Sequence, residues 1–186
     1  MFRNHLPFFR VLTVLAAACL AAGSVPAQSA VPLSSSLTPV NAKPYTSTTA
    51  TGVQIYACEY DGSHHLTWLF RSPQATLYDT VGRAVFQHEA GPSWQANDGS
   101  RIVGHPIAQM ASASAGSIPQ LLLETTSDDK SGNSVGASDG KSGGELSGVR
   151  YVQRLNTVGG GAPAQMCTAE HQIAYSPYFA NYVFWK

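Results

Sequence analysis

The stretch FQHEAGPSWQANDGSRIVGH (Phe86–His105) contains two turn signals between three short runs that are typical of β-strands. The first signal is Gly91-Pro92 and the second is Asp98-Gly99. Both favour chain reversal because glycine adopts positive φ at little cost and proline fixes its own φ. The stretch therefore predicts consecutive antiparallel strands with polar tips.

The residue alternation within this stretch assigns side chains to opposite faces of a strand. Phe86 and His88 share one face, and Gln87 and Glu89 share the other. If Phe86 points into the core, His88 does too, either as a hydrogen-bonded core residue or as an acid or base facing a pocket. Trp94 is either a core side chain or a stacking platform for a ring-shaped ligand.

Asp98 and Ser100 lie at the second turn, where they can satisfy main-chain groups without any further role. Asp98 and Glu89 nevertheless remain candidate catalytic partners of His88. Catalysis by these residues requires a second titratable group within hydrogen-bonding reach of the imidazole.

Similar short runs follow on both sides, each bounded by Gly, Pro, Asn, Asp or Ser. They are rich in β-branched and aromatic residues, which predicts an all-β fold, a sandwich or a barrel of short, mostly antiparallel strands with long loops. The expected domain is a single one covering residues 52–186. The runs outside the central stretch are GVQIYACEY (52–60), LTWLFR (66–71), IPQLLLETT (118–126), GVRYVQRLNTV (148–158), EHQIAY (170–175) and NYVFWK (181–186).

Two segments lack this pattern. Residues 28–51 are rich in Ser, Thr and Pro, which predicts a flexible or extended lead-in. Residues 127–147 are rich in Gly and Ser, which predicts a mobile surface loop between two strands.

The N-terminus has the features of a secretory signal peptide over residues 1–27. Arg3 and Arg10 precede an apolar run from Val11 to Ala22, and small residues follow it. The run is too short to span a bilayer, so we expect export to the periplasm or the extracellular space, with no transmembrane anchor. Lipidation at Cys19 is an alternative, although Leu15 is one position too far away for a good lipobox.

Cys58 and Cys167 remain after removal of the signal peptide. In an oxidising compartment an even pair indicates a disulfide, and two buried free thiols are the alternative. Without residues 1–27, the eleven acidic side chains outnumber nine basic ones. This balance gives no indication of a nucleic-acid partner.

No cofactor or metal site can be recognised from the spacing of potential ligands. The histidines show neither an H-x-H nor an H-E-x-x-H spacing, although a site assembled across strands would leave no such pattern. No Gly-rich loop opens a helix as a phosphate site would require.

Several motifs together resemble a secreted family of bacteria and fungi, the domain of unknown function 3455. They include H.AGPSW…DGS.IVG (88–104), IPQLLLE (118–124), VQRLNTVGGGAPAQMC (152–167) and AYSPYFANYVFW (174–185). The resemblance runs from about Gly52 to Trp185 and implies no activity. Some fungal members carry a malate-dehydrogenase label, which this sequence does not support because it lacks the dinucleotide-binding glycine motif.

Three hypotheses for function follow. The leading one is binding of a small molecule or of an envelope or extracellular glycan without catalysis, through Trp94, His88, Tyr56 and Trp68. The second is a hydrolase or lyase in which His88 acts as general acid or base. The third is a structural envelope or matrix component with no ligand pocket and an exposed apolar patch. The oligomeric state is not predicted.

Overall fold

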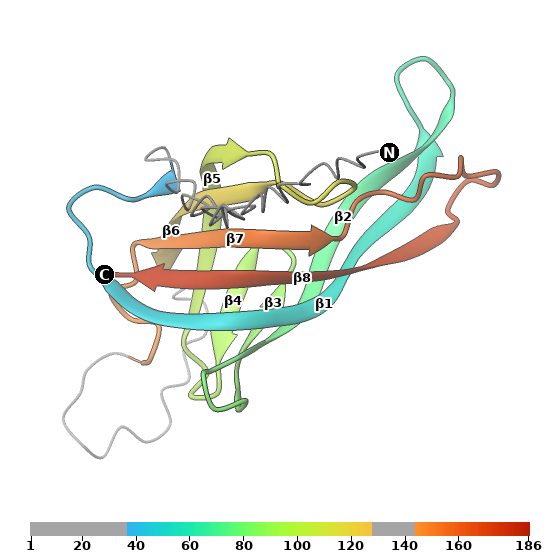
Figure 1. Ribbon diagram of the computed structural model, residues 1–186. Coiled ribbons are helices and arrows are strands. Elements are labelled where there is room, and N and C mark those ends of the chain that lie inside the picture. Colours follow the sequence, from blue (N-terminus) through green and yellow to red (C-terminus); the bar gives the residue numbers. More distant parts are fainter. Residues whose placement is uncertain (1–36, 128–143) are drawn as a thin grey trace, which may run out of the picture. The chain divides into compact units, whose positions relative to one another are not determined.

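The computed structural model describes residues 37–127 and 144–186 (Figure 1). Over these ranges, eight antiparallel strands follow one another around a closed barrel, and β8 pairs with β1 to complete it. The predicted all-β, antiparallel fold is therefore confirmed, and it is a barrel. The strands are β1 (Pro44–Tyr60), β2 (Leu66–Tyr78), β3 (Ala84–Glu89), β4 (Ser93–Ala96), β5 (Arg101–Met110), β6 (Gln120–Ser127), β7 (Tyr151–Gly159) and β8 (Ile173–Trp185).

The first strand begins earlier than the sequence predicts. Residues 44–51, which were expected in the flexible lead-in, belong to β1 and pair with β8 and β2. Thr49 and Thr51 are exposed, whereas Ala50 between them is fully buried. Threonine is a good strand former, so this Ser/Thr run suits a strand with a polar outer face. The expected signal peptide lies outside the described residues.

The segment predicted to be a mobile loop over 127–147 is described only at its two ends. Ser127 is the last residue of β6. Leu146 is 1% exposed and belongs to the main core, so residues 144–147 pack against the barrel. Residues 128–143 lie outside the described ranges.

Large side chains from several strands fill the barrel interior. Phe86 and Phe184 are in contact, with ring centroids 4.8 Å apart, and Trp94 and Tyr182 pack beside them. An eight-stranded barrel is just wide enough for side chains to fill it or for one small ligand. Small residues on the neighbouring strands, Ala50, Ala75 and Ala180, leave room for these rings.

A second apolar cluster lies on the outside of the barrel. Leu37 covers Leu122 and Leu155 there, and the partly buried Val183 and Tyr151 pack against them. The Gln153 amide donates a hydrogen bond to the Leu37 carbonyl at 2.6 Å. The segment before β1 thus covers the outer surface of β6 and β7.

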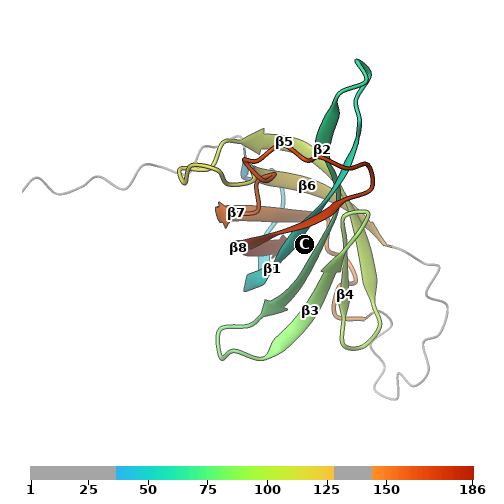
Figure 2. The same ribbon diagram turned by 90° about the vertical axis from the view of Figure 1, so that its right-hand side faces the viewer.

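The ends of β1, β2 and β8 extend beyond the other strands (Figures 1 and 2). We call this extension the ribbon, and it comprises residues 54–60, 66–74 and 171–176. A disulfide between Cys58 and Cys167 joins it to the segment before β8, as the cysteine pair predicts. Strands β1, β2 and β8 are 17, 13 and 13 residues long, so they are not the short strands that we expected.

The loop between β5 and β6 closes one end of the barrel. Ile118 is buried, and its N–H donates to the Gly159 carbonyl at 3.0 Å. Gly160 has a φ of 79°, and a β-carbon there would lie 2.9 Å from the Tyr178 side chain and 3.2 Å from Ile118. The glycines of VGGGAP (158–163) therefore permit a close backbone approach at this end of the barrel.

Candidate functional site

His88 lies inside the barrel, where its alternation with Phe86 places it. The side chain is 2% exposed, and its Nδ1 lies 2.8 Å from the Ser93 carbonyl oxygen. Because only a protonated nitrogen can donate to that carbonyl, Nδ1 carries the proton. The imidazole stacks on the Trp94 indole and contacts the edge of Tyr182.

Burial is the main influence on the titration of His88. It lowers the pKa of the imidazole to about 4, the hydrogen bond to Ser93 opposes this change, and the nearby Arg154 charge adds to it. His88 is consequently neutral at ordinary pH. A group with this pKa is a poor general acid or base near neutrality, where a catalytic pKa close to the working pH is best.

The two carboxylates suggested as partners of His88 lie elsewhere. Glu89 is exposed on the opposite face of β3. The Asp98 carboxylate accepts hydrogen bonds from the Ser100 N–H and hydroxyl and from the Glu145 N–H. Burial raises the pKa of Asp98, but these hydrogen bonds outweigh that effect and lower it overall. Asp98 therefore has the turn-stabilising role that its Asp-Gly sequence predicts.

Trp94 is 1% exposed, and the indole lies against Gly104 on β5. A β-carbon at position 104 would be 2.8 Å from Cζ3 of the indole. The indole Nε1 is buried without a hydrogen-bond partner among the described residues. Trp94 is thus a packed core side chain and lines neither of the two pockets described below.

A polar cluster lies between the aromatic core and the closing loop. Arg154 points inward from β7, opposite Tyr182, and donates from Nε and Nη2 to the Pro119 carbonyl at 3.1 and 2.9 Å. The hydroxyls of Tyr178 and Tyr182 are 3.4 Å apart. Burial raises the pKa of both phenols, so they remain protonated. This cluster holds the closing loop onto the barrel.

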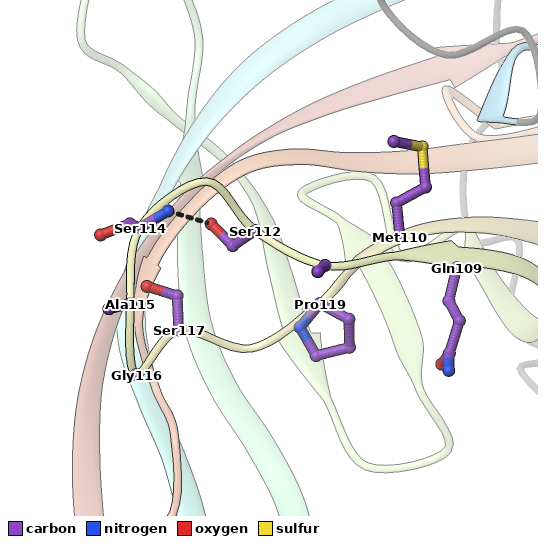
Figure 3. Close-up of a pocket in the computed structure, with 9 residues that line it drawn as sticks. Gln109, Met110, Ser112, Ser114, Ala115, Gly116, Ser117 and Pro119 are labelled. Atoms are coloured by element: carbon purple, nitrogen blue, oxygen red, sulfur yellow. Dashed lines mark hydrogen bonds between the residues drawn. The ribbon is translucent and has the colours of Figure 1, made fainter.

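The outer surface of the closing loop forms a pocket of about 460 Å³ (Figure 3). Ser112 and Ser114 line it, and the Ser114 N–H donates to the Ser112 hydroxyl. The Ser112 hydroxyl itself donates to the Thr157 carbonyl at 2.6 Å. These two serines therefore stabilise the loop, and none of the described residues that line this pocket is aromatic.

Tyr56 and Trp68, both predicted as ligand-binding residues, lie on the ribbon next to the disulfide. The Tyr56 hydroxyl donates to the Gly160 carbonyl, and the Trp68 indole N–H donates to the Gln165 carbonyl, each at 2.8 Å. These bonds attach the ribbon to residues 160–167. Trp68 also lines a pocket of about 250 Å³ with Leu66 and the 162–167 segment.

Exposed aromatic and polar side chains lie together on a different surface, the outer side of β1 and its neighbouring strands. On β8 the outward side chains include Tyr175, which is 63% exposed, and Phe179, which is 39% exposed. Their neighbours across the strands are uncharged. We call this surface the β1 outer face, and it comprises Thr49, Thr51, Val53, Ile55, Gln74, Thr76, Tyr175, Pro177, Phe179 and Asn181.

Neither Tyr175 nor Phe179 is among the ligand-binding residues predicted from the sequence. The available signal was the alternation in IAYSPYFANYVFW (173–185), in which even-numbered positions from 178 are buried and odd-numbered positions face outward. The alternation does not show which outward residues of β8 are exposed, because Leu37 covers the far end of this strand.

A protein-family model described as "Protein of unknown function (DUF3455)" matches residues 39–186. The chain belongs to the DUF3455 family. Neither a curated protein nor a solved structure matches the chain. In the described ranges of this DUF3455 protein, no group of three His, Cys, Asp or Glu side chains is arranged to hold a metal ion. Those ranges also contain no helix long and apolar enough to cross a membrane.

Proposed function

We propose that this DUF3455 protein is an exported, non-catalytic protein that binds a neutral polysaccharide chain through the β1 outer face. The observation that carries the proposal is the exposure of Tyr175 and Phe179 on a sheet surface where their direct cross-strand partners on β1, Ile55 and Thr51, are uncharged. The ligand class is the glycan expected from the sequence, but the binding surface lies outside the barrel.

The chemistry of this face suits sugar rings. The C–H faces of a pyranose are apolar and stack on aromatic rings, while its hydroxyls pair with side-chain hydroxyls and amides. Tyr175 and Phe179 are four residues apart on one strand, so they are separated by about 14 Å. Thr51 lies opposite Phe179, and Gln74 lies opposite Val53, between the two rings.

The rigidity of the surface supports binding to an extended chain. β1 has hydrogen-bonded neighbours on both sides along this face. A surface that is already ordered loses little conformational freedom on binding. The lack of charged side chains in the β1 outer face favours a neutral polymer over an anionic one.

The side chains inside the barrel give less support to catalysis by His88 or to ligand binding by Trp94. The predicted acid–base group, His88, is buried, and its protonated nitrogen is bonded to a main-chain carbonyl. Trp94 packs against Gly104 instead of facing a pocket. Export, which this proposal includes, is supported by the Cys58–Cys167 disulfide, because such bonds persist in oxidising compartments.

The test is co-sedimentation of the protein lacking residues 1–27 with insoluble cellulose, chitin and β-glucan, with alginate gel as the anionic comparison. The double variant Tyr175→Ala/Phe179→Ala should lose at least tenfold in affinity for the neutral polymer that binds. The control is Tyr60→Ala/Phe70→Ala, which removes two rings of about 50% exposure from the opposite face of the ribbon. Equal binding by both double variants, or binding to alginate alone, would overturn the proposal.

A further inference from the structure

One edge of the ribbon has an unpaired strand. Strand β2 pairs with β1 from Leu66 to Tyr78, but it pairs with β3 only from Ala75 to Tyr78. In the part of the chain that the structure describes, residues 66–74 therefore have a neighbouring strand on one side only. Such an edge is a template for pairing with another strand.

The hydrogen-bond alternation shows which main-chain groups face this edge. The Asp61 N–H donates to the His65 carbonyl at 2.9 Å, so these two residues form a hydrogen-bonded pair. In an antiparallel ladder every second pair bonds, which leaves the N–H and C=O groups of Leu66, Trp68 and Phe70 pointing away from β1.

An independent observation on β1 agrees with this assignment. Cys58 lies opposite Trp68, yet its N–H donates to the Gln172 carbonyl and its carbonyl accepts from the His171 N–H. Cys58 therefore bonds away from β2. Trp68 in turn has its main-chain groups directed to the free edge.

The side chains along this edge favour strand pairing. Residues 66–70 read LTWLF, and Leu69 and Phe70 are 39% and 52% exposed. Natural edges are usually guarded by charges, prolines or bulges. In β2 the bulge at Arg71 and the proline at position 73 come only after residues 66–70.

We propose that the free edge of β2 pairs with the same edge of a second copy of this chain, antiparallel and centred on Trp68. The two-fold axis is perpendicular to the sheet, so Leu66 of each copy pairs with Phe70 of the other. Thr67 pairs with Leu69, so the paired residues 66–70 carry only apolar or threonine side chains. Both faces of the ribbon continue across the junction.

Charge complementarity selects a second copy as the occupant. Antiparallel pairing brings Arg71, which also forms an ion pair with Glu59 of its own chain, toward the Asp61–His65 turn of the second copy. The Asp61 carboxylate is held ionised by hydrogen bonds from the His65 and Ser63 N–H groups, which lower its pKa. Each contact between Arg71 and this turn occurs twice because of the two-fold symmetry.

The test is sedimentation equilibrium of the protein lacking residues 1–27, with the disulfide intact, over a range of micromolar concentrations. The wild type should have twice the monomer mass. Phe70→Pro removes an outward N–H that β1 does not use, and prolines are tolerated at such edge positions. Because two hydrogen bonds disappear per dimer, the dissociation constant should rise by ~100-fold or more. Phe70→Ala is the control that keeps the N–H, and it should weaken the dimer far less.

A second pair of variants keeps the proposal testable if proline disturbs the ribbon. In Thr67→Lys/Leu69→Lys, the lysine at position 67 of each copy faces the lysine at position 69 of the other. These two pairs of like charges should repel each other, so the variant should be a monomer. Ile173→Lys/Tyr175→Lys adds the same charge at the other edge of the ribbon and should remain a dimer while losing polysaccharide binding. A monomeric wild type, a dimeric Phe70→Pro, or dissociation by the control lysines would overturn the proposal without bearing on the polysaccharide test.

Discussion

The imidazole of His88 lies flat against the indole of Trp94, with ring centroids 4.7 Å apart and ring planes inclined by 6°. The two residues face each other directly on β3 and β4. The stacked pair therefore fills part of the barrel interior with side chains. The predictions below test the packing, the electrostatics and the covalent structure around it.

The first prediction concerns the pH dependence of stability. His88 has a folded pKa of about 4 against an ordinary value of 6.5, so between these values the unfolded chain binds a proton that the folded protein does not. Stability should therefore fall as pH decreases from about 6.5 to 4, by about 3 kcal/mol from this group. Denaturant unfolding of wild type and His88→Phe at pH 7 and pH 4.5 measures the difference. The variant should have the flatter pH profile, and equal slopes would contradict this account.

The second prediction concerns the charge of Arg154, which lies close enough to affect several interior groups. Because that charge helps to lower the pKa of His88, Arg154→Met should raise this pKa toward its ordinary value. NMR titration of the His88 ring protons measures the change. An unchanged His88 curve would mean that the Arg154 charge does not contribute to the lowered pKa of the imidazole.

The third prediction concerns the space beneath Trp94. Gly104→Ala should destabilise the fold by about 1–3 kcal/mol, because the new methyl group would overlap the indole and approach Leu123 to 3.1 Å. The matched control is Gly62→Ala, where no atom lies within 4 Å of the added β-carbon. Urea unfolding curves of the two variants decide the matter, and similar midpoints would show that Trp94 can move aside.

The fourth prediction concerns the Cys58–Cys167 disulfide, whose ends are 109 positions apart. Replacing both cysteines by serine should lower the free energy of unfolding by roughly 2–5 kcal/mol, since a closed loop of this length restricts the unfolded chain. Unfolding of the double variant, compared with wild type with and without reductant, measures this effect. A wild-type transition that is insensitive to reductant would show that the bridge contributes little.

Much of the fold followed from local patterns. The alternation predicted that Phe86 and His88 share one face, which is the buried one, and Asp98-Gly99 predicted the turn into β5. The pairing of β1 with β8 could not be predicted in this way, because it joins the two ends of the domain and leaves no local pattern. The choice between barrel and sandwich depended on that one contact.

The candidate site was harder to predict than the fold. Trp68 and Tyr56 looked like ligand-binding residues, but their polar atoms bond to the 160–165 backbone, which is distant in sequence. The alternation within β8 places Tyr175 and Phe179 on one face, but the sequence does not show which face points outward. Whether an outward side chain is exposed depends on tertiary cover, as Val183, which packs against the Leu37 cluster, illustrates.

The Cys58–Cys167 bond makes a covalent ring that contains β2 through β7 entirely. Most of β1 and all of β8 are tails that leave this ring, and they pair with each other from Pro44 to Ala57. A single break in the backbone between the two cysteines would therefore release no fragment, because both pieces stay joined until the bridge is reduced. The barrel closes where β1 pairs with β8. Closure therefore brings together the two segments of the chain that lie outside the covalent ring.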